Sequence, residues 1–174
     1  MKNIFVTIFS MLLLSSCFNS SSLKTHSFAG AKLVATAKVS NLVTEIEALE
    51  SSNTMSINLN SNQNVKIGKA LNISLTPSEN GYLKIIIVNP KGEKDLVIQN
   101  SLHNGYIKAN HKFSTTNNKF SLRAFNPQGL HYVITIFSQK NSYINTKNLL
   151  SKLKDISKGK YLKHNISIYP MRVY

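Results

Sequence analysis

Apolar and polar residues alternate in several short stretches of this chain, a pattern typical of strands with one buried face. Residues 55–60 alternate strictly, and residues 65–75 carry apolar side chains at every odd position except Lys69, with Gly68 predicting a bend or bulge. Residues 82–88 (YLKIIIV) form a nearly continuous apolar run, which predicts a strand covered on both faces. An Asn-Gly pair before this run and Asn-Pro-Lys-Gly after it predict turns on either side.

Further short strands are expected at residues 95–98 and 106–109. Residues 120–124 and 133–137 alternate again around an Asn-Pro-Gln-Gly turn, which predicts a second long hairpin. A final strand is expected at residues 166–169. Seven or eight short strands separated by turns predict a mainly β fold, either a β-sandwich of about seven strands or a small barrel.

Two stretches have helical spacing instead. Between residues 31 and 50, apolar residues recur every three or four positions, as in an amphipathic helix, although alternation in the middle also allows a strand. Residues 149–156 place leucine and isoleucine at helical spacing, with lysines on or near the other face. Asn145 or Thr146 could cap this second helix, and Gly159 could end it. We therefore expect one N-terminal and one C-terminal helix packed on the sandwich.

The first seventeen residues follow a different pattern. Lys2 precedes an apolar run over residues 4–14, which is too short to cross a bilayer as a helix, and Leu14-Ser15-Ser16-Cys17 ends the run. This order resembles the secretory signal and lipobox of bacterial lipoproteins. The resemblance implies cleavage between Ser16 and Cys17, a diacylglycerol on the Cys17 sulfur and an acyl chain on its freed amine. The alternatives are an uncleaved signal anchor and an ordinary signal whose cysteine is incidental.

These features divide the chain into a signal peptide (1–16), a lipidated flexible tether (17–30), a helix (31–50) and a β-sandwich with the C-terminal helix and final strand (51–174). Without residues 1–16, 158 of the 174 residues remain, enough for one domain with a core. Because Cys17 is the only cysteine, the exported domain must hold without disulfides.

The residue that follows Cys17 also carries information within the lipoprotein resemblance. It is Phe18 rather than Asp. In that family, the lack of an Asp favours sorting to the outer membrane. The domain would then face the periplasm.

The chain is strongly basic, with 21 Lys and Arg against 7 Asp and Glu and a net charge of +14. The lysines are spread along the sequence, and an exported protein does not meet DNA, so we expect no nucleic-acid partner. A diffuse positive field attracts anionic lipid or acidic partners. Abundant Asn, Lys, Ile and Ser also fit a general compositional bias, which accounts for most of the charge.

Turn and core residues of the central segment carry a second resemblance. Gly-Tyr-Leu opens the apolar strand at residues 81–88, Pro-Lys-Gly follows it, and residues 120–130 contain a Phe, an Ala and a Pro-Gln-Gly turn in order. Residues 55–140 thereby resemble a bacterial domain of unknown function that commonly follows lipoprotein signals or sits in larger envelope proteins. The resemblance implies an immunoglobulin-like β-sandwich. It implies no reaction, because the motif residues are turn and core types.

The sequence shows no catalytic or metal-binding pattern. Its five histidines lack metal-ligand spacing, and no nucleophile elbow, phosphate-binding glycine loop or suitably spaced carboxylate pair occurs. We therefore expect no enzyme activity, no metal, no small-molecule substrate and no cofactor beyond the lipid on Cys17.

Basic and aromatic residues of the C-terminal part remain as candidates for binding a protein partner. This part contains Tyr143, Tyr161, Tyr169 and Tyr174 with Lys147, Lys152, Lys154, Lys158, Lys160, Lys163 and Arg172, and the residues that we predict to bind a partner are Tyr161, Lys160, Lys163 and Arg172. In the alternative interpretation, the tyrosines pack the last helix and strand onto the sandwich while the lysines face water.

The sequence as a whole predicts a non-enzymatic, lipid-anchored β-sandwich on the periplasmic face of the outer membrane. It would act as a protein-binding or assembly module of the bacterial cell envelope. By architecture, the chain is similar to the outer-membrane lipoprotein of type VI secretion, which hangs from a lipid and grips a periplasmic partner. The alternative is a basic envelope lipoprotein that binds anionic cell-wall glycan or lipid.

Replacement of Cys17 tests the anchor. When cells that express the full chain are fed a clickable fatty acid, we expect labelled protein in the membrane fraction for the wild type and no label for Cys17→Ala, because the thiol is the acylated group. Equal labelling of the two proteins, or a wild-type protein that keeps residues 1–16 in mass spectrometry, contradicts the prediction.

Overall fold

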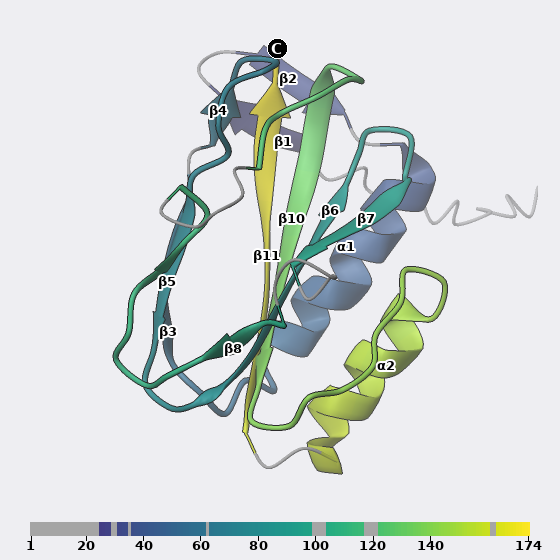
Figure 1. The fold of residues 1–174 in the computed structure, drawn as a ribbon. Helices are drawn as coiled ribbons and strands as arrows, with labels where there is room; N and C mark the ends of the chain where they lie inside the picture. The colour runs from purple at the N-terminus through teal and green to yellow at the C-terminus, as the bar shows by residue number, and fades with distance from the viewer. Residues whose placement is uncertain are drawn as a thin grey trace, which may run out of the picture.

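The computed structural model describes residues 25–28, 31–34, 36–61, 63–98, 104–116, 122–160 and 163–174. Two β-sheets face each other, and two helices cover the outer face of the larger sheet (Figure 1). The predicted fold class, a mainly β sandwich with two helices packed on it, is confirmed.

The larger sheet has the strand order β4-β11-β10-β6-β7, and β8 also pairs with β6. Its central strands are long: β10 (Gly129–Ser138) and β11 (His164–Val173) pair antiparallel over ten residues, from Gly129 opposite Val173 to Ser138 opposite His164. Strand β6 (Gly81–Val88) lies on the other side of β10. The shorter strands are β4 (Asn64–Val65), β7 (Lys94–Ile98) and β8 (Tyr106–Ile107).

The smaller sheet has the order β3-β5-β9, built from β3 (Ile57–Ser61), β5 (Ile73–Pro77) and β9 (Phe113–Ser114). Its apolar side chains meet those of the larger sheet in a first core. Leu75 and Phe113 from one sheet and Ile85, Val133 and Phe137 from the other are among the buried members. At about 25 cal/mol for each Å² of apolar surface removed from water, such burial is what holds a disulfide-free domain.

The two helices form a second core on the opposite face of the larger sheet. Helix α1 (Ala37–Glu50) begins after Thr36, whose Oγ1 accepts a hydrogen bond from the Val39 amide at 3.4 Å. It buries Val39, Leu42, Val43 and Ile46, which share one face because they recur at helical spacing. Helix α2 (Leu149–Asp155) continues into a wider turn (Ile156–Lys160). Helical geometry is lost within this turn at Gly159, where φ is 76°.

Strand β6 shows why its sequence is a nearly continuous apolar run. Leu83, Ile85 and Ile87 point into the core between the sheets, whereas Ile86 and Val88 point to the helices. Because successive side chains of a strand point to opposite faces, a strand between two cores must be apolar at nearly every position. The predicted coverage of both faces is confirmed.

The outer edge of β11 is covered by a short strand and, beyond it, by side chains and backbone groups of the segment after α1. Strand β4 pairs only with Arg172 and Val173. Further along, Asn53 accepts from the Ile166 amide at 2.7 Å and donates to the Ile166 carbonyl at 2.8 Å, and Glu50 accepts from the Ile168 amide at 2.8 Å. These bonds satisfy backbone groups that a neighbouring strand would otherwise use.

The N-terminal boundaries differ from the prediction. Residues 25–28 and 31–34 form a hairpin, β1 (Thr25–Phe28) and β2 (Ala31–Val34), where the sequence predicts a tether to residue 30 and a helix from residue 31. The helix begins only at Ala37, because Thr36 provides the cap. The lipidation and cleavage residues Ser16 and Cys17 lie outside the described residues.

One predicted strand and one predicted hairpin are also wrong. Residues 65–75 are not one bent strand: the chain leaves the larger sheet after β4, turns at Gly68 (φ 79°), and enters the smaller sheet as β5. The expected hairpin between residues 120–124 and 133–137 is absent from the described residues 122–138, since β10 pairs with β6 and β11. Arg123 makes a single bridge, to Ala70. Local alternation could not reveal these long-range partners.

Gly81 has a packing role that its sequence context hides. In an Asn-Gly turn a positive φ is expected, yet Gly81 is not among the positive-φ glycines. A Cβ at this position would lie 2.6 Å from Phe137 Cε1 and 2.8 Å from the Ser138 carbonyl oxygen. The glycine therefore allows β6 to approach β10 beside the Phe137 ring.

We expect Gly81→Ala to lower the free energy of unfolding by about 1–3 kcal/mol, the usual cost of overpacking a core, measured by urea denaturation. Combining it with Phe137→Leu should cost less than the sum of the two changes, because removing the ring relieves part of the clash. Additive costs, or an unchanged stability for Gly81→Ala, contradict this role.

Candidate binding groove

The partner-binding residues predicted from the sequence do not come together. Tyr161 and the side chain of Lys160 lie outside the described residues. Lys163 forms an ion pair with Glu79, whose other oxygen accepts from Gln139 at 2.6 Å. Arg172 lies near the opposite end of β11, nine residues away and hence about 30 Å along an extended strand. Lys163 and Arg172 therefore belong to different ends of the molecule.

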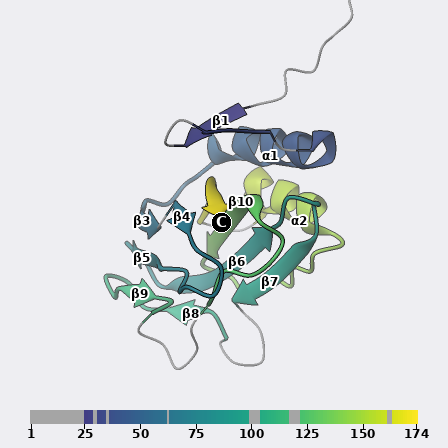
Figure 2. The same cartoon turned by 90° about the horizontal axis from the view of Figure 1, so that it is seen from above.

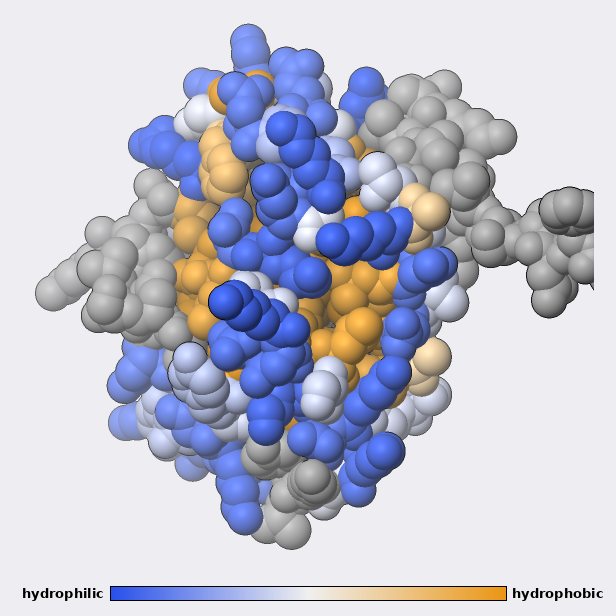
Figure 3. Space-filling view, turned by 90° about the vertical axis from the view of Figure 1, so that its right-hand side faces the viewer, coloured by the Kyte–Doolittle hydropathy of each residue, from blue (hydrophilic) through white to orange (hydrophobic). Residues whose placement is uncertain are grey.

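A groove instead lies where α1, β7 and α2 meet. Two adjoining cavities of about 220 and 100 Å³ share Leu42 from α1, Lys94 from β7 and Leu150 from α2. Figure 3 shows this face of the molecule, with apolar side chains exposed in its middle and hydrophilic ones around them. We call this surface the α1–α2 groove.

The groove has an apolar floor and a basic rim. The helical spacing that buries α1 and α2 also sets Val39, Leu42, Leu149 and Leu150 along the floor. The rim carries three lysines from three separate elements: Lys38, Lys94 and Lys147. A polar ligand group could therefore meet positive charge while an apolar group enters between the helices.

The loop before α2 places Lys147 on the rim. The side chain of Asn145 accepts hydrogen bonds from the backbone amides of Lys147 and Asn148, each at 3.0 Å, in the manner of an Asx turn. The prediction that Asn145 or Thr146 caps α2 is wrong, and Asn145 instead organises the turn that precedes the helix. The N-cap residue itself is Asn148.

The groove continues along β7 to an exposed tyrosine. A third cavity of about 330 Å³ is lined by Leu96, Asn141, Tyr143 and Ile144. Leu96 is two residues beyond Lys94, so the two side chains share one face of the strand. Tyr143 is 78% exposed, the highest value among the large apolar and aromatic residues exposed in the described parts of the chain.

The charges around the groove are unequal. Glu45 is its acidic lining residue, and it is already paired with Lys154 of α2 at 2.6 Å, which joins the two helices across the floor. Lys38, Lys94 and Lys147 have no ion-pair partner among the residues that the structure describes. The rim therefore presents net positive charge to a ligand.

The described residues offer no constellation for catalysis by a metal. They contain no cluster of three or more His, Cys, Asp or Glu side chains that could hold an ion. The two buried histidines lie on strands: His164 Nε2 of β11 is 3.3 Å from Ser52 Oγ, and His131 Nδ1 of β10 is 3.3 Å from the Gly129 carbonyl of the same strand. Burial lowers the pKa of both. None of the described helices is long and apolar enough to cross a membrane.

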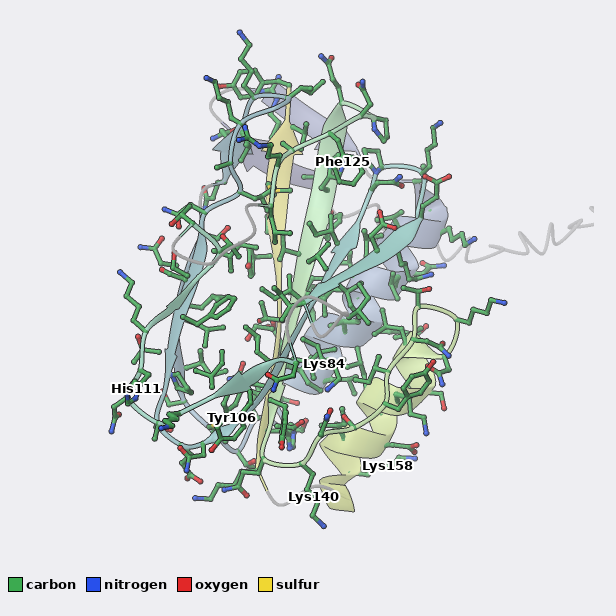
Figure 4. All side chains as sticks on the ribbon, in the orientation of Figure 1. Lys84, Tyr106, His111, Phe125, Lys140 and Lys158 are labelled. Carbon is green, nitrogen blue, oxygen red and sulfur yellow. The ribbon has the colours of Figure 1, made fainter. Side chains whose placement is uncertain are left out.

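Lys84 is a buried amine that the sequence analysis did not single out. It lies on the helix-facing side of β6, opposite Ile136 of β10, and is fully buried (Figure 4). Its Nζ has no hydrogen-bond partner in the described part of the chain. Burial lowers the pKa of Lys84 to about 8. Such an amine can be nucleophilic, but Lys84 does not line the α1–α2 groove, so it destabilises the fold rather than serving that site.

The α1–α2 groove lies partly inside and partly outside a segment that matches a known domain family. Residues 64–141 match the model of a domain of unknown function, DUF4384. The predicted resemblance to a domain of unknown function over residues 55–140 thus agrees with this match. The DUF4384 segment runs from β4 through β10, so β7 and Asn141 belong to it, whereas α1, α2 and β11 lie outside. The groove forms where this segment meets the two helices.

Among solved structures, the chain is similar to the CARDB domain of the PF1109 protein from Pyrococcus furiosus, solved in complex with di-metal ions. The similarity covers 69% of this chain and 87% of that one, with 8% sequence identity and a TM-score of 0.35. No curated protein matches the chain. Similarity at this level carries no conclusion about function.

Replacing Lys84 should stabilise the protein. The pKa of the Lys84 amine is about 8 in the folded protein and 10.5 in the unfolded chain. At pH values between these two, the unfolded state therefore carries more bound protons than the folded state. Stability therefore rises with pH across this window and carries a penalty of about 3 kcal/mol below pH 8. We expect Lys84→Met to unfold at higher urea at pH 7, with an advantage that shrinks as the pH approaches 10.5.

The exposed Lys112→Met serves as the matched control and should change stability by less than about 0.5 kcal/mol. A Lys84→Met variant that is less stable than the wild type at pH 7 would show that the amine has a stabilising partner.

Proposed function

We propose that this chain is a non-enzymatic binding module of the bacterial cell envelope, held by lipid on Cys17 and facing the periplasm from the outer membrane. The order of residues 2–17 supports the anchor, because it resembles a lipoprotein signal. The α1–α2 groove is the observation that carries the binding role, because an apolar floor with an unpaired basic rim is a surface to which a partner can bind.

The groove suits a protein segment better than a small molecule. Its cavities are shallow and extend side by side from the α1–α2 junction to Tyr143, so that a ligand would lie along the surface. An exposed tyrosine, such as Tyr143, is the kind of residue that anchors protein interfaces. The lysines on the rim favour a partner with acidic side chains beside its apolar anchors.

An assembly role follows from these features together. A lipid-anchored domain with an open groove can hold a periplasmic protein at the membrane, as in a type VI-like secretion complex. The lysine rim also favours a second candidate, an anionic cell-wall glycan or lipid. The two differ in salt dependence, since a glycan held by exposed charges is released by salt and a segment buried on an apolar floor is retained.

Photocrosslinking tests the proposal. A photoreactive amino acid in place of Leu150 or Tyr143, in the full chain expressed in cells, should crosslink to one defined protein and survive a high-salt wash. The same amino acid in place of Lys112, which is exposed beside β9 of the smaller sheet and thus away from the two helices, serves as the matched position and should not give this product.

Charge reversal in the rim makes the test specific. Lys38→Glu with Lys94→Glu should reduce the crosslink by about tenfold, because two attractive contacts become repulsive. Lys108→Glu with Lys112→Glu changes the net charge equally and should leave it intact. Equal loss in both variants, or a product that disappears in high salt, overturns the protein-binding role in favour of a diffuse electrostatic one.

A further inference from the structure

A second basic surface lies at the end of the sandwich where the C-terminus sits. The turn after β4 is bound there by the last residue and by the segment before β10. The Ile67 amide donates to the Tyr174 carbonyl at 2.8 Å, and the Tyr174 amide donates to the Val65 carbonyl at 3.1 Å. The Gly68 amide donates to the Ala124 carbonyl at 2.8 Å, and the Ala124 amide donates back to the Lys69 carbonyl at 2.9 Å. Three segments distant in sequence thus form one surface.

This surface combines cations with exposed aromatic rings. Phe125 is 51% exposed and Tyr174 is 52% exposed, while Lys66 and Lys69 are exposed on the turn between them. Residues 63–72, 122–130 and 168–174 contain no acidic side chain. We call the surface the C-terminal end surface; its members are Lys66, Lys69, Arg123, Phe125, Arg172 and Tyr174.

The backbone holds one of these cations in place. Arg123 Nη1 donates to the Gly68 carbonyl at 2.9 Å, so the guanidinium lies beside the turn that carries both lysines. On the neighbouring β6–β7 turn, the acidic Glu93 accepts a hydrogen bond from Asn89 Nδ2 at 2.5 Å within its own turn. Positive charge is therefore concentrated around the turn that follows β4.

The N-terminal hairpin lies at the same end. Figure 1 shows β1 and β2 at the same end of the molecule as the C-terminus, and Figure 2 looks down onto this end. Phe125 lies at this end and His111 at the other (Figure 4). If the chain is anchored by its N-terminal segment, which rests on the proposed function, this end is the one nearest the bilayer.

We propose that the C-terminal end surface docks on anionic phospholipid headgroups. Phe125 and Tyr174 would enter the interfacial region, where aromatic rings are favoured, and the cations would meet the phosphates. A bilayer is the occupant that fits best because the surface is an end of the molecule with protruding rings, and its residues do not line the cavities described above. The α1–α2 groove would remain free for its own partner.

Depth-dependent quenching tests the orientation. The full chain is reconstituted in vesicles of phosphatidylcholine, with or without phosphatidylglycerol, that contain brominated lipid, and a fluorescent amino acid replaces either Phe125 or His111. We expect phosphatidylglycerol to increase the quenching at position 125 severalfold, with little change at 111, and salt to reverse the increase.

Charge reversal identifies the surface. Lys66→Glu with Lys69→Glu should lower the affinity for these vesicles by at least about thirtyfold, because two attractive charges near an anionic surface become repulsive. Lys108→Glu with Lys112→Glu is the control of equal net charge and should leave docking unchanged, and thermal unfolding verifies that all variants fold. Equal quenching at 125 and 111, equal effects of both charge pairs, or binding to an acidic glycan without binding to vesicles would overturn the proposal.

Flotation of the same samples separates this inference from the anchor. A protein that floats with both vesicle types but shows no lipid-dependent quenching at position 125 overturns the docking and keeps the anchor. A protein that floats only with phosphatidylglycerol, and loses flotation in Lys66→Glu with Lys69→Glu, supports the docking and overturns the anchor.

Discussion

The structure depends on covering both faces of the larger sheet. Strands β6 and β10 send alternate side chains into two different cores, one shared with the smaller sheet and one shared with the helices. Neither core could be lost without exposing a row of isoleucine, valine and leucine to water. In a domain without disulfides, this two-sided burial is the main source of stability. It also explains why the two helices lie on the sheet side by side, which creates the groove between them.

The parts of the fold that the sequence predicted are those with a local signal. The run at residues 82–88 predicted a strand covered on both faces, and the spacing of Leu149 to Ile156 predicted α2. The hairpin expected between residues 120–124 and 133–137 is absent from the described residues, because the two neighbours of β10 are β6 and β11, both distant in sequence. Gly81 is misleading for a related reason: its neighbour Phe137 is distant in sequence, so the Asn-Gly pair resembles an ordinary turn.

The candidate site could not be predicted from the sequence for the same reason. Its rim lysines come from residues 38, 94 and 147, and they meet only because α1 and α2 pack on the same face beside β7. The basic C-terminal residues resemble one patch because they are close in sequence, but the extended β11 separates Lys163 from Arg172. The sequence does carry one signal for the buried amine, because Lys84 is a charged residue within the otherwise apolar run at residues 82–88.

The side chains along β11 have a consequence for self-association. A sheet edge with free backbone groups can recruit another strand, which is how many β proteins form fibres. Asn53 occupies the amide and the carbonyl of Ile166, and Glu50 occupies the amide of Ile168, groups that an incoming strand would need. Glu50 at the end of α1 and Asn53 in the loop after it thus prevent a further strand from pairing with this part of the β11 edge.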